Sequence, residues 1–357
     1  MIGTIEELLA RPVSFLDNTN AVSGDGIAIS SRVRLARNLA HHRFPCAADD
    51  AEKQEICQTV SDAVRDGKIL DFDGECREFD LSTLDETERG VLLERRLASS
   101  EFVSGDTAGK MLMVCPQERC SIMINEEDQI RMQSIRPGFQ LPEVYAEISA
   151  IDDALSQKVD YAFDEQLGYL TSCPTNVGTG MRASVMLHLP GLVLTDQIAP
   201  TIHGINKLHL AARGIFGEGS DNLGNLFQIS NQSTLGESEE KTINDLASVI
   251  EQIIYHEKRA RQTLLDHDRF SLLDYIGRAY GVLRHSYKLS GKEAMQSLSG
   301  VRLGVDLGLF SAIDLSKVNE LFIATGQAHL QKNAGHQLNS NARDIVRAQL
   351  CREKLKG

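Results

Sequence analysis

The first two thirds of the chain contain short runs with the alternation of a β-sheet. Val185, Leu187 and Leu189 alternate with serine, methionine and histidine, a period of two that is typical of a half-buried strand. Other strand-like runs are MLMVC (111–115), SIMIN (121–125), QIRMQSI (129–135), HLAARGIF (209–216) and LFQIS (226–230). Short polar turns join them, which favours an antiparallel sheet with helices packed on a face.

Apolar residues recur at helical spacing elsewhere. In AEKQEICQTVSDAVRDG they are Ile56, Val60 and Val64. From about residue 242 the helical pattern takes over, beginning with Ile243, Leu246, Ile250, Ile253 and Ile254 and continuing to the last residues. We therefore predict an α+β fold with a first domain over 1–256 that contains the sheet, followed by an all-helical domain over 257–357.

Composition and charge narrow the class of protein. The chain has 357 residues, 42% of them hydrophobic, and its longest apolar runs fall short of a membrane span of ~20 residues. The acidic N-terminus lacks the basic region of a signal peptide, and the seven cysteines lack zinc-type pairing, so we expect a cytoplasmic protein with reduced thiols and no resident metal. A net charge of −13 argues against nucleic-acid binding but allows a local basic pocket for a compact polyanion.

Five arginines lie at strand ends or glycine turns. They are Arg32, Arg34, Arg131, Arg182 and Arg213. Arg32 and Arg34 are two apart on an extended segment and therefore point to the same side. A solvated or salt-bridged surface position would explain each arginine taken alone. Because a guanidinium fork binds phosphate oxygens in pairs and keeps its charge, five converging arginines would hold a triphosphate.

Carboxylates and a cysteine accompany these arginines. The segment NEED (125–128) ends a strand-like run, and Glu218 follows a glycine. Such carboxylates suit a metal site, a general base or a polar turn. Cys173 ends another strand-like run, GYLTSCP, and Arg182 opens the strand after the glycine turn. A tight connection with a buried thiol is the alternative to a binding loop. The chain contains no G-x-x-x-x-G-K-[ST] phosphate loop.

Five segments resemble a known family in their order along the chain. SSRVRLARN, NEEDQIR, CPTNVGTGMRASV, RGIFGE and ISN-x-x-x-LG are similar to the nucleotide and guanidino-substrate segments of the phosphagen (guanidino) kinases, over residues 24–255. That family has an antiparallel sheet. KEAMQSLSGVRLGVDLGL (292–309) and RDIVRA (343–348) resemble the helical domain of its bacterial protein-arginine kinases. Only 29 residues precede SSRVR, so we expect a more open site than in kinases of small guanidino compounds.

The resemblance implies transfer of the γ-phosphoryl group of ATP, with Mg²⁺ carried by the nucleotide, to arginine side chains of proteins. Its catalytic residues would be Glu127, Glu218 and Cys173: both carboxylates clamp the guanidinium, Glu127 is the base, and Cys173 orients the substrate electrostatically. Its nucleotide-binding residues would be Ser30, Ser31, Arg32, Val33, Arg34, Arg96, Arg131, Arg182, Ala183, Ser184, Val185, Met186, Arg213, Gly214, Ile215, Phe216, Gly217 and Glu218. Arg96 stands where a histidine is expected beside the adenine, on which an arginine can also stack.

The C-terminal segment carries a second set of implied residues. Arg343, Asp344, Arg347 and Ala348 would form an allosteric phosphoarginine pocket. A surface ion pair, with the arginines one helical turn apart, is the alternative. The resemblance also implies protein substrates with exposed arginines, an activator protein, a homodimer, and a Clp-type ATPase for which proteins are marked under stress; no nucleic acid or membrane partner is expected.

Two other functions stay open. The chain could be a kinase of free arginine or another small guanidino compound, or a non-enzymatic regulator that binds phosphoarginine.

Overall fold

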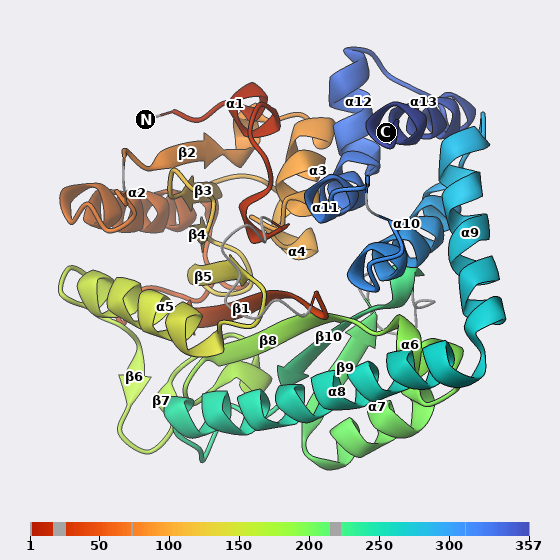
Figure 1. Cartoon of the computed structure of the whole chain (residues 1–357). Coiled ribbons are helices and arrows are strands. Elements are labelled where there is room, and N and C mark those ends of the chain that lie inside the picture. The colour runs from red at the N-terminus through yellow and green to blue at the C-terminus, as the bar shows by residue number, and fades with distance from the viewer. Residues whose placement is uncertain (1, 17–25, 73, 215–222, 311, 357) are drawn as a thin grey trace.

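An eight-stranded antiparallel sheet forms the centre of the first two thirds of the chain. The computed structural model describes residues 2–16, 26–72, 74–214, 223–310 and 312–356. Within them an eight-stranded sheet has the order β2-β3-β4-β5-β1-β8-β10-β9 (Figure 1). Its strands are β1 Ala28–Arg37, β2 Arg77–Asp80, β3 Met111–Val114, β4 Cys120–Ile124, β5 Ile130–Pro137, β8 Met181–His188, β9 Leu210–Gly214 and β10 Leu226–Asn231. The predicted α+β class with an antiparallel sheet is confirmed.

Helices flank this sheet and follow it. Those before residue 239 are α1 Ile5–Leu9, η1 Ser14–Leu16, α2 Asp50–Asp66, η3 Leu81–Thr83, α3 Glu86–Glu94, α4 Ser100–Val103, α5 Leu141–Ser156, η4 Pro174–Asn176, α6 Pro190–Leu194, α7 Ile198–Lys207 and η5 Leu223–Asn225. The helical prediction for α2 is confirmed: Asp49 caps its first turn by accepting from the Glu52 amide, and Ile56, Val60 and Val64 are buried.

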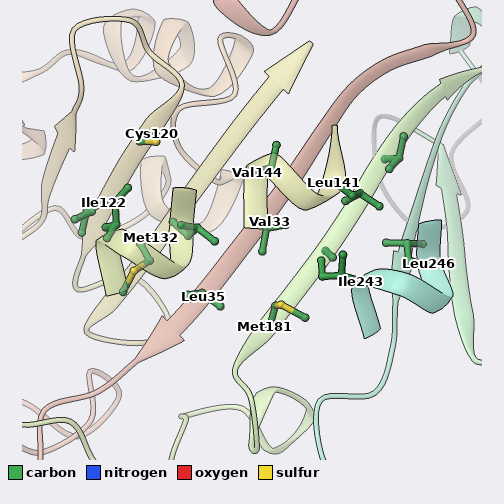
Figure 2. Close-up of a cluster of buried hydrophobic side chains, with 14 of the residues drawn as sticks. Val33, Leu35, Cys120, Ile122, Met132, Leu141, Val144, Met181, Ile243 and Leu246 are labelled. Atoms are coloured by element: carbon green, nitrogen blue, oxygen red, sulfur yellow. The ribbon is translucent and has the colours of Figure 1, made fainter. Parts of the chain in front are cut away.

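One face of the sheet forms the main core. Residues of the central strands pack there against α5 and the N-terminal half of α8 (Figure 2). They include Val33 and Leu35 of β1, Ile122 of β4, Met132 of β5 and Met181 of β8, which lie opposite Leu141 and Val144 of α5 and Ile243 and Leu246 of α8. Because strand residues alternate between faces, the side chains between these apolar residues point to the opposite face of the sheet.

The C-terminal third is helical, as predicted. Its helices are α8 Glu239–His267, α9 Arg269–His285, α10 Gly291–Asp306, α11 Leu315–Ala324, α12 Gln327–Ala334 and α13 Ser340–Lys354. Helix α8 continues through the predicted boundary at 256/257. Ala260 still packs in the core of the sheet, whereas Leu264 packs with residues of α9 and α10. One continuous helix thus joins the two predicted units, and the boundary itself stays a prediction.

The strand expected in GYLTSCP is shorter than the alternation suggests. It is limited to β7 Gly168–Tyr169, which pairs with β6 Phe163–Asp164 in a separate hairpin. The Ser172 amide donates to the Asp128 carboxylate at 2.7 Å instead of to a strand. Pro174, which has no amide hydrogen, then begins a 3₁₀ turn.

None of the helices in the described residues is long and apolar enough to cross a membrane.

Candidate active site

The strand register places the predicted arginines on one face of the sheet. Directly paired residues of neighbouring antiparallel strands point to the same face. Arg34 of β1 pairs with Arg182 of β8, and on its other side with Gln133 of β5. Arg32 and Arg131 lie two residues before Arg34 and Gln133 respectively and therefore share this face.

The fifth arginine belongs to the same face. Arg213 of β9 pairs with Gln228 of β10, which pairs in turn with Met186 of β8. Met186 lies four residues after Arg182, so the side-chain direction is the same. We call this side of the sheet, opposite the main core, the arginine face.

Burial and neighbouring positive charge lower the pKa values of two guanidinium groups on the arginine face. Burial and then the charge of Arg34 and further arginines hold the pKa of Arg32 well below its usual range. Burial and then repulsion by Arg131 and Arg182 lower the pKa of Arg34 to about 9. The Nε atom of Arg34 is buried and has no hydrogen-bond partner among the described residues. Crowded guanidinium groups with an unused donor would bind a polyphosphate, whose charge relieves their repulsion.

A pocket opens at one end of the arginine face. Its lining residues are Ser30, Arg32, Arg96, Ile135, Ser184, Met186 and Gln228. Arg96 follows the end of α3 with a left-handed φ of 61°, a conformation that favours glycine. Burial lowers the pKa of Arg96 to about 10. The structure thus brings Arg96 together with predicted nucleotide residues from β1 and β8.

Four predicted nucleotide-binding residues have side chains that do not reach this face. Ser31, Val33, Ala183 and Val185 lie at the alternate positions of β1 and β8 and are buried on the core side. Ser31 is used structurally, since its hydroxyl donates to the Gly138 carbonyl at 2.9 Å. The side chains of these four residues therefore belong to the core, and their part in nucleotide binding stays a prediction.

Carboxylates meet the arginines at one end of the central strands, where β1 ends and β5 and β8 begin. We call this end of the strands the edge of the site. Arg131 Nη1 lies 2.5 Å from Glu126 Oε2 and 3.4 Å from Glu127 Oε2. Ser99 Oγ donates to the other Glu126 oxygen at 2.5 Å. Burial would raise the pKa of Glu126, but Arg131 and the hydrogen bond from Ser99 hold it below its usual value. Glu126 is therefore a charged anchor for Arg131.

Glu127 has a different environment from its neighbour. Its side chain is 44% exposed, so solvent and a substrate can reach the carboxylate. Partial burial raises its pKa, helped by Asp128 and Glu126 and opposed by Arg131. Of the two adjacent glutamates, Glu127 is thus the one suited to accept a proton.

The Cys173 loop is fastened to the same edge. The buried Asp128 carboxylate accepts from the Ser172 amide at 2.7 Å and from Asn38 Nδ2 at 2.8 Å. Asp128 directly follows Glu127, so these bonds keep the two loops side by side. Cys173 is partly exposed, and its sulfur lies 3.0 Å from Thr175 Oγ1. The thiol and the Glu127 carboxylate are thereby carried by two adjoining, fixed loops.

Comparison with known proteins agrees with this arrangement. Residues 55–260 match the family model "ATP:guanido phosphotransferase, C-terminal catalytic domain". Residues 269–357 match the model "Protein-arginine kinase McsB C-terminal domain". This chain belongs to the ATP:guanido phosphotransferase family. The phosphagen-kinase resemblance predicted from the sequence is confirmed.

Similar proteins cover nearly the whole chain. A protein-arginine kinase of Halalkalibacterium halodurans is 48% identical over 92% of this chain and 92% of its own length. A protein-arginine kinase of Brevibacillus brevis is 45% identical over 96% of this chain and 97% of its own length. Among solved structures, lombricine kinase has a TM-score of 0.58 at 23% identity, covering 70% of this chain and 71% of that one. This last likeness supports the family fold.

Part of the predicted site lies beyond the described residues. Ile215, Phe216, Gly217 and Glu218 belong to the segment 215–222, which the structure does not describe. Arg213 and Gly214 end β9 just before it. The second guanidinium clamp, Glu218, therefore stays a prediction from family resemblance.

The C-terminal motif lies on α13. Arg347 is 5% exposed, and it donates to the Thr325 carbonyl at 3.0 Å, the Leu289 carbonyl at 2.9 Å and the Asp344 carboxylate at 2.7 Å. Arg343 donates to a backbone carbonyl at 2.9 Å. Ala348 is buried in the core of the helical region. Arg347 is therefore a buried structural residue and not part of a simple surface ion pair. Phosphoarginine binding by this motif stays a prediction.

Several residues of the site were not predicted from the sequence. Glu126 and Ser99 hold Arg131, Asp128 fastens the Cys173 loop, and Gln228 Oε1 accepts from Arg32 Nη2 at 3.3 Å. Glu126 and Asp128 were visible as part of NEED, but their separate roles depend on burial. In the described residues no group of three or more His, Cys, Asp or Glu side chains is placed to hold a metal ion.

Proposed function

We propose that this protein is an ATP-dependent protein-arginine kinase that transfers the γ-phosphoryl group of ATP to arginine side chains. The observation that carries the proposal is the arginine face, which runs from the Arg96 pocket to the Glu127 carboxylate along one side of β1. The naming of its relatives as protein-arginine kinases, at 45–48% identity over more than nine tenths of the chain, supports the substrate class.

The arginine face provides phosphate binding and stabilisation of charge in the transition state. Phosphoryl transfer depends mainly on positioning and on neutralising the charge of the transferred group. Arg32, near the pocket, and Arg34, Arg131 and Arg182, nearer the edge, would bind successive phosphates. Mg²⁺, which retains water ligands and uses few protein groups, would enter with the nucleotide and neutralise phosphate charge. The surrounding face is cationic, which fits an ion carried by phosphate rather than by a protein cage.

The edge of the site provides the chemistry of the acceptor. A guanidinium is protonated at any cellular pH and is therefore a poor nucleophile. Glu127 would orient one guanidinium nitrogen in line with the γ-phosphorus and take its proton as the N–P bond forms. The bond from the γ-phosphorus to the β-phosphate oxygen breaks in the same step, and ADP leaves. Cys173, on the adjoining loop, would orient the same group from the other side. The exposure of Glu127 leaves room for an arginine that projects from a protein.

The test is a paired assay with an arginine-containing, unstructured basic protein and with free L-arginine, both at equal MgATP. We expect kcat/KM for the protein to exceed that for the amino acid by at least ~10²-fold, about 2.7 kcal/mol of transition-state binding. Contacts outside the pocket can supply this difference. Mass spectrometry should locate the phosphate on arginine.

The same assay separates the alternatives. Comparable turnover of free arginine would favour a kinase of small guanidino compounds. Phosphoarginine binding without any transfer from ATP would favour the non-enzymatic regulator. Several further roles stay predictions of the family resemblance: an activator protein, a homodimer, the marking of proteins for a Clp-type ATPase, and the allosteric pocket at Arg343, Asp344, Arg347 and Ala348. The cytoplasmic location stays a prediction from the N-terminus and the cysteines.

A further inference from the structure

A buried polar network connects the end of β8 to helix α10 of the C-terminal region. His188, the last residue of β8, is fully buried. Its Nε2 lies 2.8 Å from Ser299 Oγ, and its Nδ1 lies 3.0 Å from Arg302 Nη1. Both partners belong to α10, which is far from β8 in the sequence but lies beside the strands β8 and β10 in the fold (Figure 1).

The protonation state of His188 follows from these partners. A guanidinium nitrogen can only donate, so His188 Nδ1 must accept and carries no hydrogen. The hydrogen is then on Nε2, which donates to the Ser299 hydroxyl. Burial and then the charges of Arg302 and Arg261 hold the pKa of His188 well below its usual range. His188 is therefore a neutral, fixed connection with one donor and one acceptor.

The charges around His188 are balanced within the network. Arg302 Nη1 lies 3.3 Å from Asp306 Oδ2, and Arg261 of α8 lies 3.2 Å from the same oxygen. Arg261 also donates to the His188 carbonyl at 3.2 Å and to Glu257 at 2.7 Å. Two guanidinium groups thus meet two carboxylates. Removing one member of such a buried set is costly, so the end of β8 is held in one position.

The same face of α10 packs against residues that line the pocket. Met295, Ser299, Arg302 and Asp306 are spaced by three or four residues and therefore share one side of the helix. Met295 packs in a cluster with Met186 and Ile135, and both of these line the pocket. Ser299 additionally accepts from Asn225 Nδ2 at 2.9 Å, just before β10 begins. Helix α10 thus packs on the arginine face, beside the strand ends that carry the lining residues of the pocket.

We propose that Ser299 and Arg302 are positioning residues for the nucleotide, which hold β8 through His188 so that Ser184 and Met186 keep the shape of the pocket. The C-terminal region would therefore contribute to nucleotide affinity, separately from any phosphoarginine binding. The inference rests on the assignment of the arginine face to the nucleotide, as part of the proposed function. His188, which lies at the far end of β8 from Arg182, should influence binding more than transfer.

The experiment compares Ser299→Ala with Ser297→Ala in the full-length protein. Ser297 is also buried on α10 but lies two positions earlier, on another side of the helix. Loss of one hydrogen-bonding hydroxyl should weaken ADP binding, measured by calorimetry, and raise KM for ATP by about threefold to tenfold. The kcat at saturating ATP should stay within twofold, and Ser297→Ala should match the wild type in both affinity and KM.

Several results would overturn the inference. A lower melting temperature of Ser299→Ala with unchanged ADP affinity would show that the network is only structural. A lower kcat with unchanged KM would also contradict it. Wild-type ADP binding is measured first: if the wild type binds ADP and Ser299→Ala binds it equally, this inference alone fails. Failure of the wild type to bind ADP would remove the proposed function as well.

Discussion

Replacement of Glu127 by glutamine tests the chemical step most directly. Glutamine keeps the size of the side chain and a hydrogen-bond acceptor for Arg131, which lies 3.4 Å from the Glu127 carboxylate. It removes the negative charge and the proton acceptor. Removal of a general base costs about 10²–10⁴-fold, and loss of the ionic clamp on the guanidinium adds to this. We therefore expect kcat to fall by at least ~10³-fold, about 4 kcal/mol of activation free energy.

The pH dependence provides a second, independent readout. Glu127 must be ionised to accept a proton, and its pKa is raised above the ordinary value of 4.5. As the pH falls through this raised pKa, the base becomes protonated and kcat/KM should decline. The pKa of the adjacent Glu126 is lowered, so Glu126 stays ionised to lower pH and should not cause this decline.

The assay measures ADP affinity together with the pH profile of kcat/KM on a basic protein. In Glu127→Gln, ADP affinity should stay within about threefold of the wild type, since the arginine face is intact, and the acid decline should disappear from the residual rate. The exposed Glu240 on α8 gives the control variant Glu240→Gln, which should behave as the wild type. A kcat within tenfold of the wild type, or an unchanged acid decline, would refute Glu127 as the base.

Three further predictions concern other parts of the site and its support. Cys173→Ala should lower kcat by at least ~10-fold without changing the melting temperature, because the thiol is small and partly exposed; normal turnover would contradict its orienting role. Arg182→Ala and Arg213→Ala should each weaken ADP binding in calorimetry by about tenfold or more, the size expected for a charge-assisted hydrogen bond. Unchanged affinity in both would place the phosphates elsewhere. Asp152→Ala should lower the free energy of unfolding, measured in urea, by about 3–5 kcal/mol. The reason is that the buried Arg37 loses the carboxylate that lies 2.6 Å away. A loss below 1 kcal/mol would argue against a stabilising role of this ion pair.

The local part of the site was predictable from the sequence. The period of two in β1 places Arg32 and Arg34 on one side, and this needs no knowledge of the fold. Convergence with Arg131, Arg182 and Arg213 depended on strand register, which joins segments far apart in the chain. Alternation within a strand identifies a face but does not say which strands are neighbours, and here the first strand lies at the centre of the sheet. The family resemblance supplied that long-range information.

Buried charge was the part that the sequence could not reveal. Arg302 and Asp306 are four apart on a helix, a spacing that usually marks a solvent-exposed ion pair. In the structure Arg302 is fully buried and meets a histidine from β8. Asp128 likewise looked like one member of a polar turn but is fully buried and joins two loops. Such roles depend on which helix or strand packs over a residue, and the local sequence pattern does not show this.

Strand β8 connects three parts of the site in order along its length. Its first residues lie at the edge with Glu127 and Cys173, Ser184 and Met186 line the pocket, and His188 meets α10. A sheet held by backbone hydrogen bonds on both sides of β8 resists stretching, so the distance between pocket and edge is fixed by the number of strand residues. Changes at α10 should therefore tilt or loosen the pocket without moving the carboxylates at the edge. This separation is why substitutions at Ser299 and at Glu127 should act on different kinetic constants, KM for ATP and kcat respectively.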